Sequence, residues 1–100
     1  MSNKPVRASN TRVSYRPGNA PVVLIPENPG RIRFAITNKS GTNLLINYGD
    51  KISGDNYAEE VGANETLRVS FPADRMYVGP VVGIFENATS GEAIISEWHK

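Results

Sequence analysis

The chain has 100 residues, a formal net charge of +1 at pH 7 and no cysteine. This length is sufficient for one domain with a modest core. The absence of cysteine excludes disulfides, thiolate nucleophiles and cysteine-based zinc sites. No apolar run approaches the ~18 residues of a membrane helix, and the start Met-Ser-Asn-Lys-Pro lacks the apolar segment of a secretory signal. We therefore expect neither a membrane span nor a signal peptide.

Positive charge is concentrated at the N-terminus. The first twenty residues contain no acidic side chain and four cationic ones: Lys4, Arg7, Arg12 and Arg16. The other eighty residues hold the remaining seven Lys or Arg and all ten Asp or Glu. The leading segment also contains two prolines and few apolar residues, a composition that disfavours an independent core. We predict an extended basic N-terminal arm over residues 1–20 that binds a partner's surface, followed by a folded domain over residues 21–100.

Short segments typical of β-strands begin near residue 12. A brief strand is possible at 12–15, and the apolar run at 22–25 ends at a Pro-Glu-Asn-Pro-Gly turn. Residues 31–37 alternate between polar and apolar types, which predicts a strand whose buried face carries Ile32, Phe34 and Ile36. After a glycine-containing turn, residues 44–48 are expected to pair with this strand as an antiparallel hairpin.

The second half of the chain has the same pattern of short strand-like segments separated by turns. Residues 58–61 form either an edge strand or one helical turn, and further strands are expected at 67–71, 75–78, 81–85 and 93–98. Within the third of these, Gly83 would allow a neighbouring side chain or backbone to approach closely. Turn signals recur every ~8–12 residues. The sequence therefore predicts an all-β, antiparallel β-sandwich, Ig-like or jelly-roll-like, with seven or eight short strands.

The sequence offers little for catalysis or for metal binding. His99 is the single histidine, and a penultimate residue is poorly placed to serve as a general base. In the acidic loop at 50–56, Ile52 occupies the third ligand position of a calcium-binding loop. Three Asn-x-Ser/Thr triplets begin at residues 38, 64 and 87, and we interpret these asparagines as turn formers. We expect no catalytic residue, no metal and no cofactor.

Binding to another protein is the better-supported class of function. Arg31 and Arg33 share the outer face of one predicted strand, so the candidate partner-binding residues are Lys4, Arg7, Arg12, Arg16, Arg31 and Arg33. Trp98 is expected in the core or at its edge, and Tyr57 is the best placed aromatic residue for contact with a glycan. Nucleic-acid binders usually spread cations over a folded face, whereas here the excess lies in the arm.

Three segments resemble small β-sandwich proteins of tailed bacteriophage virions. With φ for an apolar residue, segment 29–40 is similar to their Arg-x-x-φ-x-φ-x-Asn-x-Ser opening, and segment 44–49 to the strand that follows it. Segment 77–85, followed by 93–98, resembles their Tyr-x-Gly-Pro-Val-x-φ-φ hairpin with a terminal φ-x-Glu. The resemblance covers residues 22–98 and implies a virion structural role without catalytic residues.

Members of this group occur as capsid decoration proteins, head fibres and tail accessories. Our first hypothesis within this role is a capsid decoration or cement protein that binds the major capsid protein, or another virion protein, from the particle's exterior. Such a protein is made in the host cytoplasm and forms symmetric homo-oligomers on the particle. An arm that orders on binding would cover a large area, and its cations would speed docking on an acidic shell. The alternative is a receptor- or glycan-binding module of a head fibre or tail. A cytosolic nucleic-acid binder is a third reading, and it predicts an affinity that falls steeply with salt.

Overall fold

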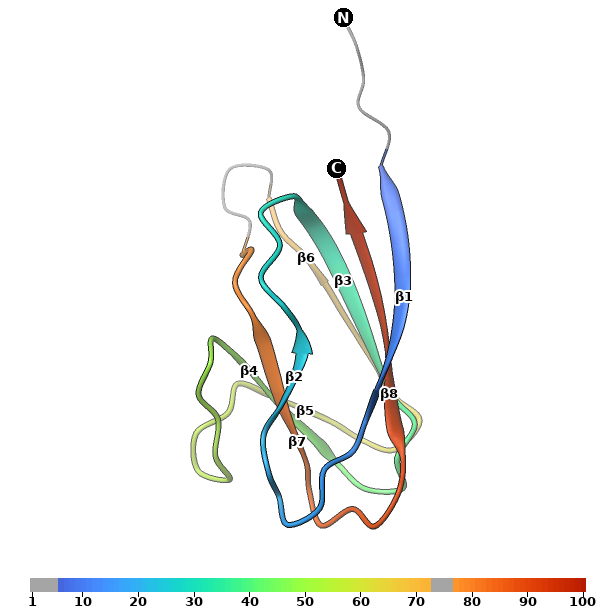
Figure 1. Cartoon of the computed structure of the whole chain (residues 1–100), viewed down its shortest axis with the longest axis vertical. Coiled ribbons are helices and arrows are strands. Elements are labelled where there is room, and N and C mark those ends of the chain that lie inside the picture. The colour runs from blue at the N-terminus through green and yellow to red at the C-terminus, as the bar shows by residue number, and fades with distance from the viewer. Residues whose placement is uncertain (1–5, 73–76) are drawn as a thin grey trace, which may run out of the picture.

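The chain folds into two four-stranded antiparallel sheets that pack face to face, as the computed structural model in Figure 1 shows. The structure describes residues 6–72 and 77–100, which contain no helix. The β-sandwich expected from the sequence is confirmed. Its strands are β1 (Arg7–Ser14), β2 (Val22–Ile25), β3 (Arg31–Asn38), β4 (Leu44–Tyr48), β5 (Glu59–Val61), β6 (Thr66–Ser70), β7 (Val81–Phe85) and β8 (Glu92–His99).

The strand order identifies the sandwich as a jelly roll. Sheet A has the order β1-β8-β3-β6, and sheet B has the order β2-β7-β4-β5. The pairs β1–β8, β2–β7, β3–β6 and β4–β5 are nested, as in one long hairpin rolled into two layers. This eight-stranded, double-sheet arrangement is the jelly-roll alternative rather than the Ig-like one.

The predicted hairpin of residues 31–37 with residues 44–48 is wrong. In the structure, β3 lies in sheet A between β8 and β6, whereas β4 lies in sheet B between β7 and β5. The strands β7 and β8 are likewise in different sheets, so the segments compared with a viral hairpin do not pair. Turn residues show where the chain reverses, but they do not determine which sheet receives the next strand.

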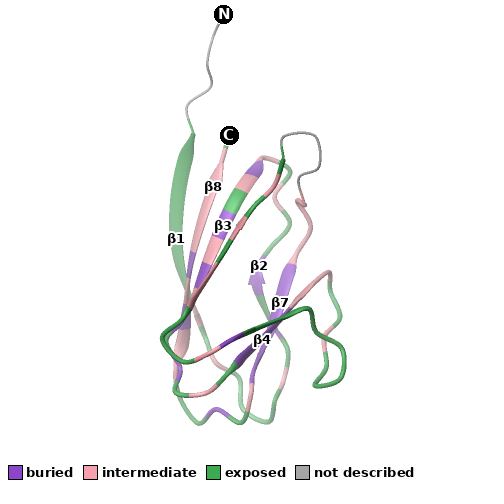
Figure 2. Ribbon diagram, turned by 180° about the vertical axis from the view of Figure 1, so that it is seen from behind, coloured by how far each residue is buried: buried purple, intermediate pink, exposed green. Residues whose placement is uncertain are grey.

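The first strand lies inside the segment expected to form the arm. β1 pairs with β8 from Arg7 to Ser14 without a register shift, so the strand considered possible at 12–15 begins earlier than predicted. It is an edge strand, and its side chains are exposed apart from the partly buried Val13. Figure 2 shows this contrast between β1 and the more buried strands beside it. Residues 7–14 are therefore extended and hydrogen-bonded to the sandwich.

Two other predicted elements have different outcomes. Within residues 58–61, the structure has an edge strand, β5, rather than a helical turn. The strand expected at 75–78 lies partly outside the described residues, and its described part, Tyr77 and Val78, is not in a strand. The turn asparagines Asn64 and Asn87 have φ values of 64° and 53°, the left-handed conformation that asparagine tolerates in turns.

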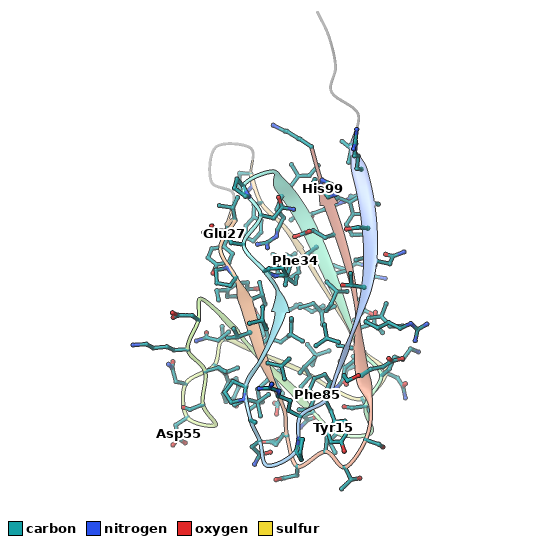
Figure 3. All side chains as sticks on the ribbon, in the orientation of Figure 1. Tyr15, Glu27, Phe34, Asp55, Phe85 and His99 are labelled. Atoms are coloured by element: carbon teal, nitrogen blue, oxygen red, sulfur yellow. The ribbon has the colours of Figure 1, made fainter. Side chains whose placement is uncertain are left out.

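The hydrophobic core fills the space between the two sheets. Phe34 points inward from sheet A and Phe85 from sheet B, as Figure 3 shows. Tyr15, Tyr48 and Phe71 pack against the core from its ends and edges. The most deeply buried side chains of this cluster are Leu24, Ile25, Phe34, Ile36, Leu44, Ile46, Val81, Phe85, Ala93 and Ile95.

The close approach predicted at Gly83 is confirmed. A Cβ atom at this position would lie 2.7 Å from Leu24 Cδ1 and 3.1 Å from the backbone oxygen of Leu45. Leu24 therefore occupies the space that a side chain at Gly83 would need. The absent side chain leaves room for Leu24, from the edge strand β2, to pack over β7.

We predict that Gly83→Ala lowers the free energy of unfolding by about 1–3 kcal/mol, because the added methyl overpacks a filled site. Urea unfolding followed by fluorescence measures the change. Gly54→Ala is the matched control, since a Cβ there meets no described heavy atom within 4 Å. Equal stability of the two variants would contradict the packing role of Gly83.

A β-bulge between Arg31 and Arg33 turns the side chain of Arg31 inward. The guanidinium is fully buried, and its Nε donates to Glu97 Oε2 at 2.8 Å. Its other nitrogens donate to the backbone oxygens of Pro26 at 2.7 Å, Gly79 at 2.8 Å and Tyr77 at 3.2 Å. The prediction that Arg31 contacts a partner is therefore wrong, since this side chain has no exposed surface on the folded chain. Its role is structural.

We predict that Arg31→Met lowers the free energy of unfolding by about 3 kcal/mol or more, because Glu97 and three carbonyl groups lose a buried donor. Arg33→Met, on the exposed side of the same strand, should cost at most ~1 kcal/mol. Denaturant unfolding of both variants tests the difference. Similar losses in the two variants would refute the structural assignment of Arg31.

Candidate partner-binding surface

The candidate cationic residues do not form one compact cluster. Lys4 lies outside the described residues, and Arg31 is buried. Arg7 begins β1 and Arg16 follows its end, which separates them by ~30 Å at the rise of a β-strand. Of the predicted set, only Arg12 and Arg33 fall on one described sheet face together, as the pairing of β1, β8 and β3 shows.

That face, the outer face of sheet A, carries mainly polar side chains from four described strands. Strand alternation sends Phe34, Ile36 and Ile95 into the core and their neighbours outward. The registers of the four strands then place the outward residues in rows. The outer face comprises Ala8, Asn10, Arg12, Ser14, Arg33, Ala35, Thr37, Thr66, Arg68, Ser70, Glu92, Ile94, Ser96 and Trp98.

Cross-strand contacts order the side chains of this face. The Ser96 hydroxyl donates to Asn10 Oδ1 at 2.8 Å. Thr37 and Thr66 share a hydroxyl hydrogen bond of 2.8 Å. Arg12 forms an ion pair with Glu92. Such pairs restrict the side chains to defined positions on the sheet, so the face is largely preorganised.

The outer face also carries an aromatic–cation stack. The Arg33 guanidinium carbon lies 4.4 Å from the centroid of the Trp98 ring. Beside this stack, Arg68 and the small residues Ala35 and Ser70 complete a shallow hollow of about 260 Å³. With three arginines and one glutamate, the face defined above carries net positive charge. It is suited to an acidic, relatively flat partner surface.

The position of Trp98 differs from the one expected from the sequence. It was expected in the core or at its edge, but it is half-buried on the outer face of sheet A. In β8, Ala93 and Ile95 point into the core. Trp98 lies on the opposite face of the strand, together with Ile94 and Ser96. Its ring is covered by Arg33 and not by the second sheet.

Arg68 was not among the candidate residues predicted from the sequence, although the structure places it beside Arg33 on the outer face. The alternation of Arg68 with Leu67 and Val69 indicates an outward side chain. What it does not indicate is the pairing of Ala35 with Arg68, which brings this cation beside Arg33. That proximity depends on the β3–β6 register, and those strands are not consecutive in the chain.

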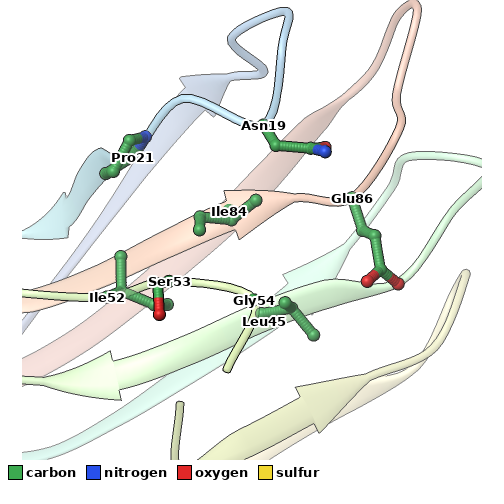
Figure 4. Close-up of a pocket in the computed structure, with 8 residues that line it drawn as sticks. All are labelled: Asn19, Pro21, Leu45, Ile52, Ser53, Gly54, Ile84 and Glu86. Carbon is green, nitrogen blue, oxygen red and sulfur yellow. The ribbon is translucent and has the colours of Figure 1, made fainter. Parts of the chain in front are cut away.

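A second hollow lies on the outer face of sheet B and is drawn in Figure 4. Leu45 and Ile84 form its floor, and Ile52, from the loop after β4, lies over them. Its volume of about 230 Å³ is below the ~300–1,000 Å³ of typical ligand pockets. Leu45 and Ile84 are almost fully buried although they point away from the main core. The loop therefore acts as a cover for sheet B.

The residue types of interest for catalysis or metal binding in this chain are His, Asp and Glu. Residues 6–72 and 77–100 contain no group of three or more His, Asp or Glu that could hold a metal ion. His99 ends β8, and its Nδ1 lies 3.3 Å from the backbone oxygen of Lys100. In the same ranges, no helix has the length and apolar character needed to cross a membrane.

The pKa of Tyr48, at the end of β4, is displaced. Burial raises the pKa of Tyr48 above its ordinary value of 10.0, and the negative charge of Glu59 and the nearby Tyr77 raise it further. A raised pKa in the folded state means that the unfolded chain loses this proton first as the pH rises. The contribution of Tyr48 to stability is therefore present below pH 10 and is lost as the pH rises through the folded-state value.

We predict that Tyr48→Phe reduces the loss of stability between pH 9 and pH 11 relative to the unsubstituted chain. Urea unfolding of both proteins at these two pH values gives the change in the free energy of unfolding. Other side chains that titrate in this range affect both proteins equally. A decline that is as steep in the variant would contradict the role of Tyr48.

Comparisons with known proteins address the fold. No family model matches the chain, and no curated protein matches it. Among solved structures, the chain is similar to one described as "Bacillus endospore appendages form a novel family of disulfide-linked pili". The two chains are 11% identical with a TM-score of 0.58, over 99% of this chain and 91% of that chain. At this identity the likeness shows that the two proteins share the sandwich fold.

Proposed function

We propose that this chain is a non-catalytic structural protein that binds a larger protein assembly through the outer face of sheet A. The observation that carries the proposal is the polar outer face on which Arg33, stacked on Trp98, lies beside Arg68. Tryptophan and arginine are the residue types most enriched at interface hot spots. Guanidinium groups also bind carboxylates with defined geometry.

The more specific form of the proposal is a decoration or cement protein of a tailed-phage capsid. Its support is the resemblance of segments 29–40, 44–49 and 77–98 to small virion proteins. The partner would be the major capsid protein or another virion protein, and the protein would lie on the particle's exterior. Repetition of weak contacts over a symmetric lattice would give high avidity to a small binding face.

The N-terminal basic residues have a specific place in this proposal. β1 forms the edge of sheet A, with Arg12 on the outer face and Arg7 at the start of the strand. The charge of Arg12 is balanced by Glu92, so Arg7 and Arg16 would provide most of the steering at the two ends of the edge. Cations of this kind mainly increase the association rate and its sensitivity to salt.

A subunit of a protein filament is a second candidate, and the similarity to the pilus structure favours it. That relative is described as disulfide-linked, whereas this chain has no cysteine. A filament of this chain would therefore be joined by non-covalent contacts. Glycan binding by a head fibre or tail has weaker support: Tyr57 is exposed, but Arg33 already covers one face of the Trp98 ring.

We predict that the double variant Arg33→Ala/Arg68→Ala binds its assembly at least about tenfold more weakly, a loss of about 1.4 kcal/mol. The measurement is co-sedimentation of the purified chain with tailed-phage particles that lack their own copy of it. Lys51→Ala is the matched control because it removes an exposed cation from the loop over the opposite sheet.

Three outcomes would distinguish the candidates. Selective loss of sedimentation in the double variant supports the proposed face. Equal binding by both variants contradicts it. Formation of long polymers by the chain alone, without particles, would favour the filament instead.

A further inference from the structure

The outer edge of β1 is exposed along eight residues. β1 pairs on one side with β8 from Arg7 to Ser14, and no other described strand pairs with its second side. Figure 1 shows β1 at the border of the sandwich, and its side chains are exposed apart from Val13. An edge of this length presents backbone donors and acceptors that another strand can bind.

The other three edges of the sandwich are shorter or interrupted. β5 has three residues, and β6 has five and is followed by Pro72. β2 has four residues, lies between Pro21 and Pro26, and contains a register shift. Short strands, prolines and bulges are among the features that protect edges from strand addition. β1 has none of these three, since it has eight residues, contains no proline and pairs without a shift. Charged side chains also protect edges, but Arg12, near the middle of β1, is paired with Glu92.

The hydrogen bonds show which backbone groups of β1 are free. Tyr15 N donates to Gly91 O at 3.0 Å, which makes the pair 15–91 a hydrogen-bonded one. Alternate residues of an antiparallel strand share this state, so the odd-numbered residues of β1 bond to β8. Lys39 N donates to Glu92 O at 2.9 Å. The backbone amide and carbonyl groups of the even-numbered residues of β8 therefore point toward β3, as this alternation requires. The residues of β1 whose amide and carbonyl groups point to the open edge are Ala8, Asn10, Arg12 and Ser14.

We infer that the open edge of β1 binds β1 of a second copy of this chain, antiparallel, about a two-fold axis at Thr11. The axis pairs Ala8 with Ser14 and Asn10 with Arg12, so the free residues of one copy meet the free residues of the other. A one-residue shift would place free groups opposite occupied ones. In this register the edge is self-complementary in its hydrogen bonds, as pairing with a second copy requires.

The side chains are compatible with the same register. Thr11 lies opposite its own copy, and threonine–threonine pairs are favourable across strands. Arg12 lies opposite Asn10, so no two arginines are directly opposed. Arg12 is already paired with Glu92, which reduces repulsion between the copies. A shift of the axis by one residue to Arg12 would oppose two arginines directly and is disfavoured.

The dimer would join the two A sheets into one continuous sheet of eight strands. Because the two-fold axis is perpendicular to the sheet, both outer faces would point to the same side. The pairing concerns the strand edge and does not depend on the binding face proposed above. Loss of binding to particles in the Arg33/Arg68 variant and loss of dimerisation in an edge variant are therefore separate results.

Single cysteines test the register because the chain contains none of its own. In the proposed pairing Thr11 and its copy form a non-hydrogen-bonded pair with Cα atoms ~4.5 Å apart, which a disulfide can bridge. Thr11→Cys should therefore cross-link the full-length protein under mild oxidation. Ser9→Cys is the control, since each copy of this residue lies opposite Val13 and ~13 Å along the strand from its mate. Cross-linking of both variants to the same extent, or of neither, would overturn the proposal.

Two substitutions at Asn10 test the edge without a covalent link. Asn10→Pro removes an amide that faces the open edge and leaves the hydrogen bonds to β8 in place. Asn10→Ala removes the same side chain, which accepts a hydrogen bond from Ser96, and keeps the amide. Sedimentation velocity should show the dimer weakened at least about tenfold by proline and little changed by alanine. A monomeric unsubstituted protein, or a folded proline variant that dimerises normally, would refute the inference.

Discussion

The two sheets are joined at one end of the sandwich by the buried guanidinium of Arg31. It bonds Glu97 of sheet A and the carbonyl oxygens of Pro26 and Gly79, which follow β2 and precede β7 of sheet B. Burial of a charge is costly unless its hydrogen bonds are satisfied. Here the carboxylate also accepts a bond from Asn28, so one side chain fixes two loops and the last strand.

This fixed end determines the surface that sheet A can offer. Glu97 points inward to Arg31, so its neighbour Trp98 must point outward, where it stacks with Arg33. The bulge that turns Arg31 inward leaves Arg33 on the outer face. The same local irregularity therefore places Arg31 in the interior and leaves Arg33 exposed on the outer face.

Local sequence patterns predicted most strands and the close approach at Gly83, because alternation and apolar runs reflect burial within one segment. They did not predict which strands pair, since that choice depends on contacts between distant segments. Arg31 was placed on the wrong face because a bulge changes the parity of a strand. Arg68 was missed because its place beside Arg33 depends on the pairing of β6 with β3. Most of β1 was assigned to an extended arm because its few apolar residues do not reveal its backbone pairing.

The loop after β4 has a consequence for how the molecule could be used. Ile52 covers Leu45 and Ile84 on sheet B, whereas sheet A has no such covering from the described residues. The two outer faces of the sandwich therefore differ: that of sheet A is exposed, and that of sheet B is partly covered by a loop of the same chain. A Cβ at Gly54, in this loop, would meet no described heavy atom within 4 Å. Foreign peptides inserted there would be displayed on the side opposite the outer face of sheet A, which is a useful geometry for tagging or vaccine scaffolds.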